Sequence, residues 1–311
     1  MRADAAPLVR EVAERLAQGY SRIDPQEPES EIARLNRASR GEFQLVQDLD
    51  VFRCLDLAMR YARRSDGAYD PTLGALLALH DRGAGTLPAL EIEHHRDDAG
   101  WRNVALEIDV RAVRLPASSL AMDLGSVGHG CALDWAARTF ARPGSRAGLL
   151  RLGALSWAWR EPPGSDSWRV DVADPRDPRR VLLWIRATNR AIGSAGQPER
   201  LSDDGAGISR PILDGETGAP VVTDVRVAVA VADSAGDAAA LSHVLFAAGS
   251  LRAARMLART SAAEAVLLVA EADGTPFVLA SASLEGRVDL ADDLAREAGE
   301  DVRYLLPPAA R

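Results

Sequence analysis

The order of the expected strands is the feature that most constrains the fold of this 311-residue chain. Residues 103–115 alternate in polarity and predict two strands around a tight turn, and residues 264–281 predict a hairpin across Asp273 and Gly274. Further strands are expected at 168–173, 181–194 and 225–232. Because neighbouring strands follow one another through short turns more often than through helices, the pattern indicates an α+β fold with mixed, mainly antiparallel sheets.

Helices are expected between these strands. Three of them come early in the chain, at 7–18, 29–36 and 49–64. The second is expected to begin at an N-cap, Ser30. Residues 237–248 predict an alanine-rich helix, with Asp237 as its N-cap and Gly249 just beyond its end. The segment 291–311 is polar and then proline-rich, and we expect this tail to fray.

The composition is that of an ordinary globular chain with a net charge of −8. All 37 basic residues are Arg and are interspersed with acidic ones, which disfavours a nucleic-acid partner, and the absence of Lys excludes chemistry that requires it. Cys54 and Cys131 lie in separate apolar stretches and are expected to be free core residues. The sequence shows neither a signal peptide nor a membrane span, so a cytoplasmic location is expected. Residues 1–290 are expected to form one domain, of one lobe or two.

Three loop segments carry residues suited to binding. The glycine-rich turn at 123–130 opens a helix, and such turns let backbone N–H groups approach a phosphate. Asp70, Thr72 and the segment Asp214–Gly218 offer oxygen atoms that could contact a metal, a sugar or a phosphate. Taken singly, each segment is also explained as a tight turn or a helix cap.

Six stretches occur in a fixed order: SEIARLN at Ser30–Asn36, SDGAYDPTLG at Ser65–Gly74, DLGSVGHG at Asp123–Gly130, WRVDVADP at Trp168–Pro175, GSAG at Gly193–Gly196 and PILDGETGAP at Pro211–Pro220. This series resembles the motifs of the ApbE-type family of FAD:protein FMN transferases. The resemblance implies an ApbE-like (T-fold-like) α+β fold. It also implies a Mg²⁺-dependent reaction in which FAD binds, AMP leaves and FMN is joined to a Thr or Ser of an acceptor protein. Members of the family are often exported.

The resemblance assigns roles to individual residues. Candidate catalytic residues are Arg210, His129 and Asp214. Candidate FAD-binding residues are Glu31, Asp70, Thr72, Asp123, Gly125, Ser126, Gly128, Ser194, Gly196 and Thr217. Candidate metal ligands are Gly128, through its carbonyl oxygen, His243 and Asp237.

Several positions depart from the family pattern. His129 stands where the family has Lys, and Pro211 stands where it has a His that is a candidate base. The helical run at 238–249 carries Ala239 and His243 in place of the Asp and Thr that would bind Mg²⁺. No aromatic residue precedes Ser30 closely, which leaves Tyr20 or Tyr69 to stack on the flavin.

These departures leave three hypotheses open. The chain is a transferase of this family with a weak activity, or a pseudoenzyme that binds flavin or a partner protein without transfer. The third is a hydrolase in which His129 and His243 bind a softer metal such as Zn²⁺ or Mn²⁺.

Overall fold

The computed structural model describes residues 6–38, 40–82, 93, 100–115, 120–141, 147–197, 210–215, 217–259, 263–299 and 302–305. The chain forms two compact units. Unit 1 consists of Met1–Thr139 and Leu213–Val221, and unit 2 consists of Phe140–Ile212 and Val222–Arg311. The predicted α+β fold is confirmed, and within the described residues the named strands pair in antiparallel fashion except for β11 with β13.

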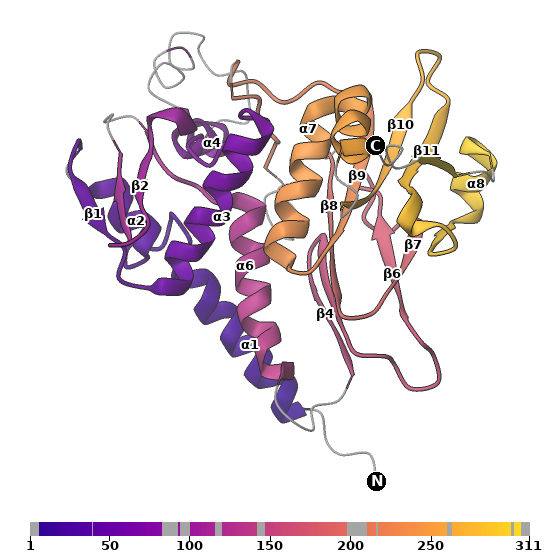
Figure 1. Cartoon of the computed structure of the whole chain (residues 1–311), viewed down its shortest axis with the longest axis horizontal. Coiled ribbons are helices and arrows are strands. Elements are labelled where there is room, and N and C mark those ends of the chain that lie inside the picture. The colour runs from indigo at the N-terminus through magenta and orange to yellow at the C-terminus, as the bar shows by residue number, and fades with distance from the viewer. Residues whose placement is uncertain are drawn as a thin grey trace. The chain divides into compact units, whose positions relative to one another are not determined.

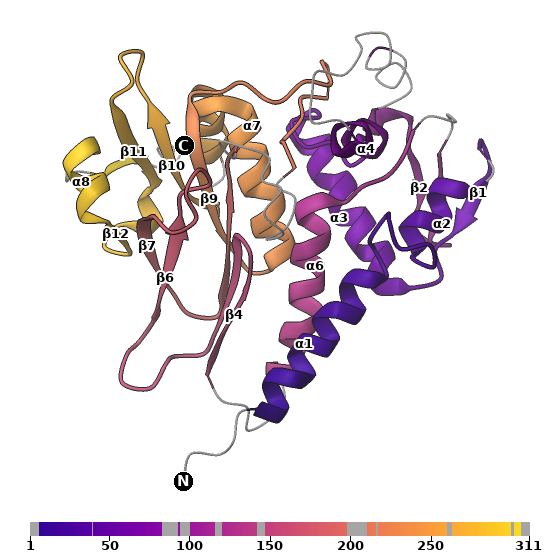
Figure 2. The ribbon, with the colours of Figure 1, turned by 180° about the vertical axis from the view of Figure 1, so that it is seen from behind.

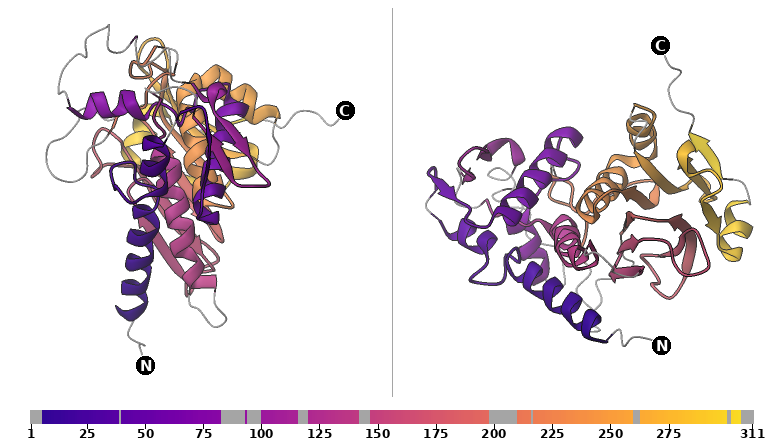
Figure 3. Two further views of the ribbon diagram at one scale, coloured as in Figure 1. Left: turned by 90° about the vertical axis from the view of Figure 1, so that its left-hand side faces the viewer. Right: turned by 60° about the horizontal axis from the view of Figure 1, so that its bottom comes forward.

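Unit 1 combines helices with a small sheet (Figure 1). Its helices are α1 (Ala6–Ser21), α2 (Glu31–Arg37), α3 (Leu49–Ser65), α4 (Gly74–Arg82) and α6 (Gly125–Ala137), with short 3₁₀ turns at Trp101–Asn103 and Arg138–Ala141. Its sheet has the strand order β1-β3-β2, formed by β1 (Phe43–Leu45), β2 (Ala105–Glu107) and β3 (Ala112–Arg114). Helices α1 and α6 lie side by side (Figures 1 and 3) and approach closely at Gly19, where a Cβ would lie 3.0 Å from the Trp135 ring.

Helix α3 shows how the local sequence builds unit 1. Its N-cap, Asp48, accepts hydrogen bonds from the backbone N–H groups of Asp50 and Val51. Asp66 adopts the left-handed conformation that ends the helix. The apolar residues at helical spacing are buried: Val51, Leu55, Ala58, Met59 and Ala62. The predicted helices at 7–18, 29–36 and 49–64 are all confirmed.

The described part of unit 2 contains two sheets and two helices. The larger sheet has the order β13-β11-β10-β9-β8-β5-β4 and the smaller one β12-β7-β6. The strands are β4 (Gly148–Leu152), β5 (Leu155–Trp159), β6 (Trp168–Ala173), β7 (Val181–Ala187), β8 (Arg190–Ala195), β9 (Val225–Ala232), β10 (Glu264–Ala270), β11 (Pro276–Ser281), β12 (Val288–Leu290) and β13 (Arg303–Leu305). The helices are α7 (Ala235–Arg259) and α8 (Asp292–Ala298), with a 3₁₀ turn at Ala282–Leu284.

The alternation of Val and Ala along β9 reflects its two different neighbours. Its valines, such as Val229, pack in one core with residues of β6 and β7. Ala230 pairs with Gly193 of β8, so both residues face the other side of the sheet. Helix α7 covers that side (Figures 1 and 2), and a Cβ on Gly193 would lie only 2.8 Å from the backbone of Ala238. Small residues therefore allow the helix to lie directly on the sheet.

One predicted detail of α7 is wrong and one is confirmed. The N-cap is Ser234 rather than Asp237, because the Ser234 hydroxyl accepts a hydrogen bond from the Asp237 N–H at 3.0 Å and donates one to its carboxylate. Gly249 (φ 73°) is non-helical and separates two helical segments of α7, so the predicted end of the first segment is confirmed, whereas the second segment was not predicted. The helix resumes because Asp224 accepts a hydrogen bond from the Ser250 N–H at 2.9 Å and so caps the second segment.

The remaining differences concern strands and the tail. Strands β4 and β5 were not predicted, and the segment predicted as one strand at 181–194 is divided by a turn at Asn189 (φ 53°). The tail includes α8 and β13, with Leu294 buried and β13 paired to β11, so its described part does not fray. The domain boundary at residue 290 stays a prediction. Among the described helices, none is long and apolar enough to cross a bilayer.

Candidate functional site

Motif stretches far apart in the sequence converge in unit 1. The side-chain amide of Asn36 donates to the Met122 carbonyl oxygen (2.9 Å) and accepts from the Met122 N–H (2.7 Å). The Asp123 N–H donates to the Pro71 carbonyl oxygen at 2.8 Å. Gly215 of the last stretch packs against the loop that contains Pro71. Four of the six motif stretches therefore form one structure around the start of α6.

The predicted turn at 123–130 is shorter than expected, because α6 begins at Gly125 and residues 125–130 are helical. The remaining glycine-rich turn and the first turn of α6 make most of their hydrogen bonds internally. The Asp123 carboxylate accepts from the Gly125 N–H at 2.8 Å, and the Leu124 carbonyl oxygen accepts from the N–H groups of Val127 and Gly128. Gly125 has a φ of 50° and open space beside it, as a glycine at a ligand-facing turn would. Ser126 is exposed, so its hydroxyl is the group of this turn best placed to meet a ligand.

Asp70 and Thr72 are hydrogen-bonded to each other. The Asp70 carboxylate accepts from the Thr72 hydroxyl (2.6 Å), the Thr72 N–H (2.9 Å) and the Trp101 N–H (3.2 Å). Thr72 is buried, and its hydroxyl oxygen also accepts from the Gly100 N–H. Burial raises the pKa of Asp70, although these hydrogen bonds act against it. The contacts support a role in holding the loop, and a direct contact of either residue with FAD stays a prediction.

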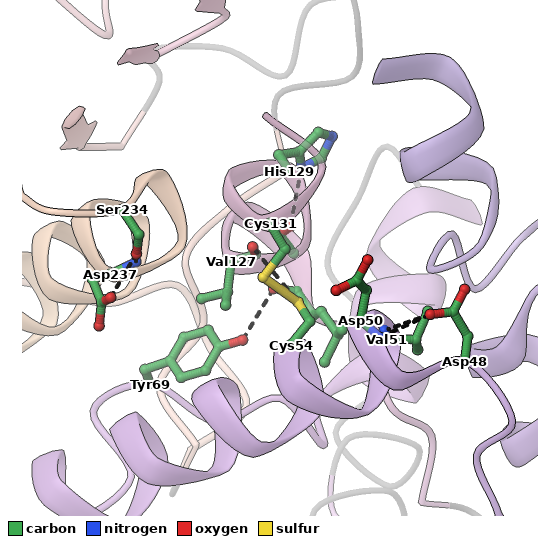
Figure 4. Close-up of a disulfide and its surroundings, with 12 residues drawn as sticks. Asp48, Asp50, Val51, Cys54, Tyr69, Val127, His129, Cys131, Ser234 and Asp237 are labelled. Carbon is green, nitrogen blue, oxygen red and sulfur yellow. Dashed lines mark hydrogen bonds between the residues drawn. A yellow bond between two sulfur atoms is a disulfide. The ribbon is translucent and has the colours of Figure 1, made fainter. Parts of the chain in front are cut away.

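The two candidate flavin-stacking residues have different surroundings. Tyr69 is buried, and its hydroxyl donates to the Leu124 carbonyl oxygen at 3.0 Å (Figure 4). Burial, followed by the charges of Asp123 and Asp70, raises the pKa of Tyr69. Its ring is therefore not available to a flavin. Tyr20 stacks on the imidazole of His129, with ring centroids 4.6 Å apart.

Three further candidate residues of unit 1, Asp214, Thr217 and Glu31, stabilise local structure. The Asp214 carboxylate accepts from the N–H (2.8 Å) and the hydroxyl (3.0 Å) of Thr217, which closes a turn on which Thr217 is exposed. Glu31 is buried, and its carboxylate accepts a long hydrogen bond from the Asp48 N–H at 3.3 Å.

The unit 2 candidates lie on close-packed backbone. A Cβ on Gly196 would clash with Pro175 at 2.6 Å and with the Arg226 carbonyl oxygen at 2.8 Å, so this glycine is required for packing. Buried Asp174, just before Pro175, binds Arg226 at 2.5 Å. The motif stretches 168–175 and 193–196 thus meet at β9. Ser194 and Arg210 are partly exposed, and their proposed contacts with FAD stay predictions.

The metal-ligand candidates do not fit Mg²⁺, which prefers oxygen ligands. Ala239 is buried and offers no ligand atom. His243 offers nitrogen, and desolvation lowers its pKa to about 4. The Asp237 carboxylate accepts a hydrogen bond from the Ser234 hydroxyl at 2.5 Å. Throughout the described parts of the chain, no cluster of three or more His, Cys, Asp or Glu residues could hold a metal ion. Metal binding by Gly128, Asp237 and His243 stays a prediction that this geometry does not support.

The sequence interpretation missed a disulfide. Cys54 of α3 and Cys131 of α6, expected to be free, are bonded across a Cα–Cα distance of 6.2 Å (Figure 4). Both residues are buried. The bond joins α3 to the middle of the helix that begins with the glycine-rich turn. Their positions in apolar helical stretches placed each in the core, but spacing alone could not show that the two helices pack against each other.

Comparison with known proteins agrees with the fold and the motif order. A sequence model of the ApbE family matches residues 2–267. The FAD:protein FMN transferase of Treponema pallidum (strain Nichols) is 26% identical over 309 residues, which cover 93% of this chain and 83% of the relative. That of Rhodobacter capsulatus is 28% identical over 207 residues, 64% of this chain and 39% of the relative.

Solved structures show the same fold. The flavin transferase ApbE from Vibrio cholerae superposes with a TM-score of 0.77 at 22% identity, covering 92% of this chain and 91% of that one. The ApbE protein from Thermotoga maritima gives a TM-score of 0.73 at 22% identity, and the match covers 97% of this chain and 93% of that one. Fold and converging motifs define an α+β protein of the flavin-transferase type. The chain belongs to the ApbE family.

Proposed function

We propose that this chain transfers FMN from FAD to a Thr or Ser hydroxyl of an acceptor protein and releases AMP. The observation that carries this proposal is the convergence of four motif stretches around the start of α6 in unit 1. A helix N-terminus favours an anion, so this turn suits the pyrophosphate of FAD. The curated relatives are named for this activity.

Several residues of the chain would bind or position FAD. Gly125 and the exposed Ser126 would meet the pyrophosphate, while Asp123, which holds the Gly125 N–H, would keep the turn in shape. Arg210 stays a candidate for binding phosphate, because a guanidinium binds phosphate but cannot accept a proton. Ser194 and Thr217 stay candidate nucleotide-binding residues. No step is assigned to Mg²⁺, since the residues in the family's ligand positions do not suit it.

A second candidate function is a pseudoenzyme that binds flavin or a partner protein without transfer. It is favoured by the metal-ligand positions, where buried Ala239 and a His243 with its pKa lowered to about 4 replace two oxygen ligands. Pro211 also lacks any side-chain proton acceptor. Fold alone does not distinguish these functions, because activity depends on the site.

One titration separates the two candidates. FAD is added to the purified chain with and without Mg²⁺, and both FAD binding and AMP release are measured in the same samples. Binding with AMP release, together with FMN joined to an acceptor peptide, supports the transferase. Binding without AMP supports the pseudoenzyme, and absence of FAD binding contradicts the flavin proposal altogether.

A double substitution tests how the site diverged. Ala239→Asp with His243→Thr supplies the two oxygen ligands of the family pattern on one face of α7. A Mg²⁺-dependent gain in AMP release would indicate a transferase site that has lost its metal ligands. Loss of an activity that the unchanged chain possesses would indicate a site rebuilt to work without them.

A further inference from the structure

The imidazole of His129 is held by two contacts within unit 1. Its Nδ1 lies 3.0 Å from the carbonyl oxygen of Gly125, one turn earlier in α6. Its ring stacks on Tyr20 of α1, with centroids 4.6 Å apart and an angle of 24° between the ring planes. Figure 4 shows the ring projecting from α6 away from Tyr69 and the disulfide. The side chain is partly exposed, so it is both oriented and reachable.

The contact with Gly125 fixes which ring nitrogen carries the hydrogen. A carbonyl oxygen can only accept a hydrogen bond, so Nδ1 must be the donor. In the neutral ring the lone pair then lies on Nε2. Within the described residues, no protein group is hydrogen-bonded to Nε2. The arrangement matches the usual one of a general base, in which one nitrogen is anchored and the other is open.

The ring also lies at a suitable place. A helical side chain leans toward the N-terminus of its helix, and the contact with the Gly125 carbonyl oxygen shows that His129 does so. The imidazole therefore lies over the first turn of α6, beside Gly125 and the exposed Ser126. This is the turn to which the proposed function assigns the pyrophosphate of FAD.

Other side chains near that turn are less suited to accept a proton. The Asp123 carboxylate accepts a hydrogen bond from the Gly125 N–H. The Asp70 carboxylate accepts three hydrogen bonds, two from Thr72 and one from Trp101. Both are buried or nearly so. His129 combines exposure with an open lone pair.

We propose that His129 is the general base of the transfer, acting through Nε2, an inference that rests on the proposed function. Nε2 takes the proton of the acceptor hydroxyl as its oxygen forms a bond to the FMN phosphorus. The bond from that phosphorus to the bridging oxygen breaks, and AMP leaves with the bonding electron pair. The imidazolium then returns the proton to solvent. Tyr20 is a positioning residue that keeps the ring over the turn.

The test compares His129→Asn with the unchanged chain. The Asn amide can still donate a hydrogen bond toward the Gly125 carbonyl oxygen but supplies no basic nitrogen. FAD affinity should change less than about threefold, whereas FMN transfer to an acceptor peptide should fall by about 100-fold or more. His80→Asn, the same change on α4 of the same unit, serves as the matched control and should keep both properties.

Chemical rescue distinguishes a base from a structural residue. In His129→Ala, added imidazole should restore a concentration-dependent part of the transfer rate, which it would not do for a side chain that only supports the helix. Tyr20→Ala should lower kcat by a larger factor than it raises the FAD dissociation constant.

Each outcome decides between the two proposals. If the unchanged chain neither releases AMP nor transfers FMN, the proposed function fails and the base assignment fails with it. If the unchanged chain is active and His129→Asn transfers FMN at the same rate, the base assignment alone is overturned. Loss of FAD binding in His129→Asn, without rescue by imidazole in His129→Ala, would also overturn it and make His129 a ligand-binding residue.

Discussion

His243 is the residue whose surroundings lead most directly to a measurable property. Desolvation lowers its pKa from 6.5 to about 4. The unfolded chain therefore binds a proton near pH 6.5 that the folded chain does not bind until about pH 4. The stability that depends on neutral His243 is complete above pH 6.5 and is lost as the pH falls toward 4, by up to about 1.4 kcal/mol per pH unit. Urea unfolding at pH 6.5 and pH 5 should differ by about 2 kcal/mol from this residue alone.

His243→Leu is the matched comparison for this prediction. It removes the titrating group and leaves every other histidine and carboxylate in place, so its stability should depend less on pH across the same window. Equal slopes in the two proteins would show that His243 does not resist protonation in the folded state.

At the same scale, the sequence identified residues better than it identified their partners. Asp70 and Thr72 were assigned to FAD, yet they bond to each other and to backbone N–H groups at Gly100 and Trp101. Tyr69 was a candidate for stacking, yet it is buried and its hydroxyl donates to the Leu124 carbonyl oxygen. The motif gives the residue types, but long-range packing decides which atoms remain available to a ligand.

Among the elements, α7 and β8 depend on Gly193 to lie close together. A Cβ at this position would be 2.8 Å from the Ala238 carbonyl carbon and 3.0 Å from the Ala239 nitrogen. Backbone cannot move aside as a flexible side chain can, so Gly193→Ala must displace the helix or the strand. We expect a loss of at least about 2 kcal/mol in the free energy of unfolding, measured with urea.

Ser194→Ala, at the next position of β8, provides the control. This residue is partly exposed and points to the other side of the strand, so its truncation should cost less than about 1 kcal/mol. Similar losses for the two variants would mean that the close approach of α7 does not determine the effect of Gly193→Ala.

Element types followed from periodicity more readily than element ends did. The amphipathic stretch at 49–64 became α3 because its apolar face and its cap agree. The first segment of α7 ends at Gly249 as predicted, but the second segment was missed because its cap, Asp224, lies 26 residues earlier in the chain. Strand β5, with the sequence LSWAW, was missed because two Trp residues and short length obscure its alternation. A contact with a residue far along the chain leaves no mark in the local pattern.

For the molecule as a whole, the order of the six motifs was enough to predict the ApbE fold. The sequence left one lobe or two open, and it did not predict the disulfide. Unit 1 takes its last segment, Leu213–Val221, from far along the chain. Disulfides persist mainly in oxidising compartments, so the Cys54–Cys131 bond weighs against the expected cytoplasmic location.

That disulfide should stabilise unit 1 substantially. It closes a loop between residues 77 positions apart, and restricting such a loop in the unfolded chain is worth about 4 kcal/mol. A dithiol reductant should therefore lower the urea midpoint of the unchanged chain, and Cys54→Ala with Cys131→Ala should show the lower midpoint without reductant. The double variant itself should not respond to the reductant.

Two titratable thiols in the folded, unreduced protein, or equal midpoints for all samples, would contradict the bond and its stabilising role. Because Cys131 lies on α6, reduction should loosen the helix that carries both the glycine-rich turn and His129.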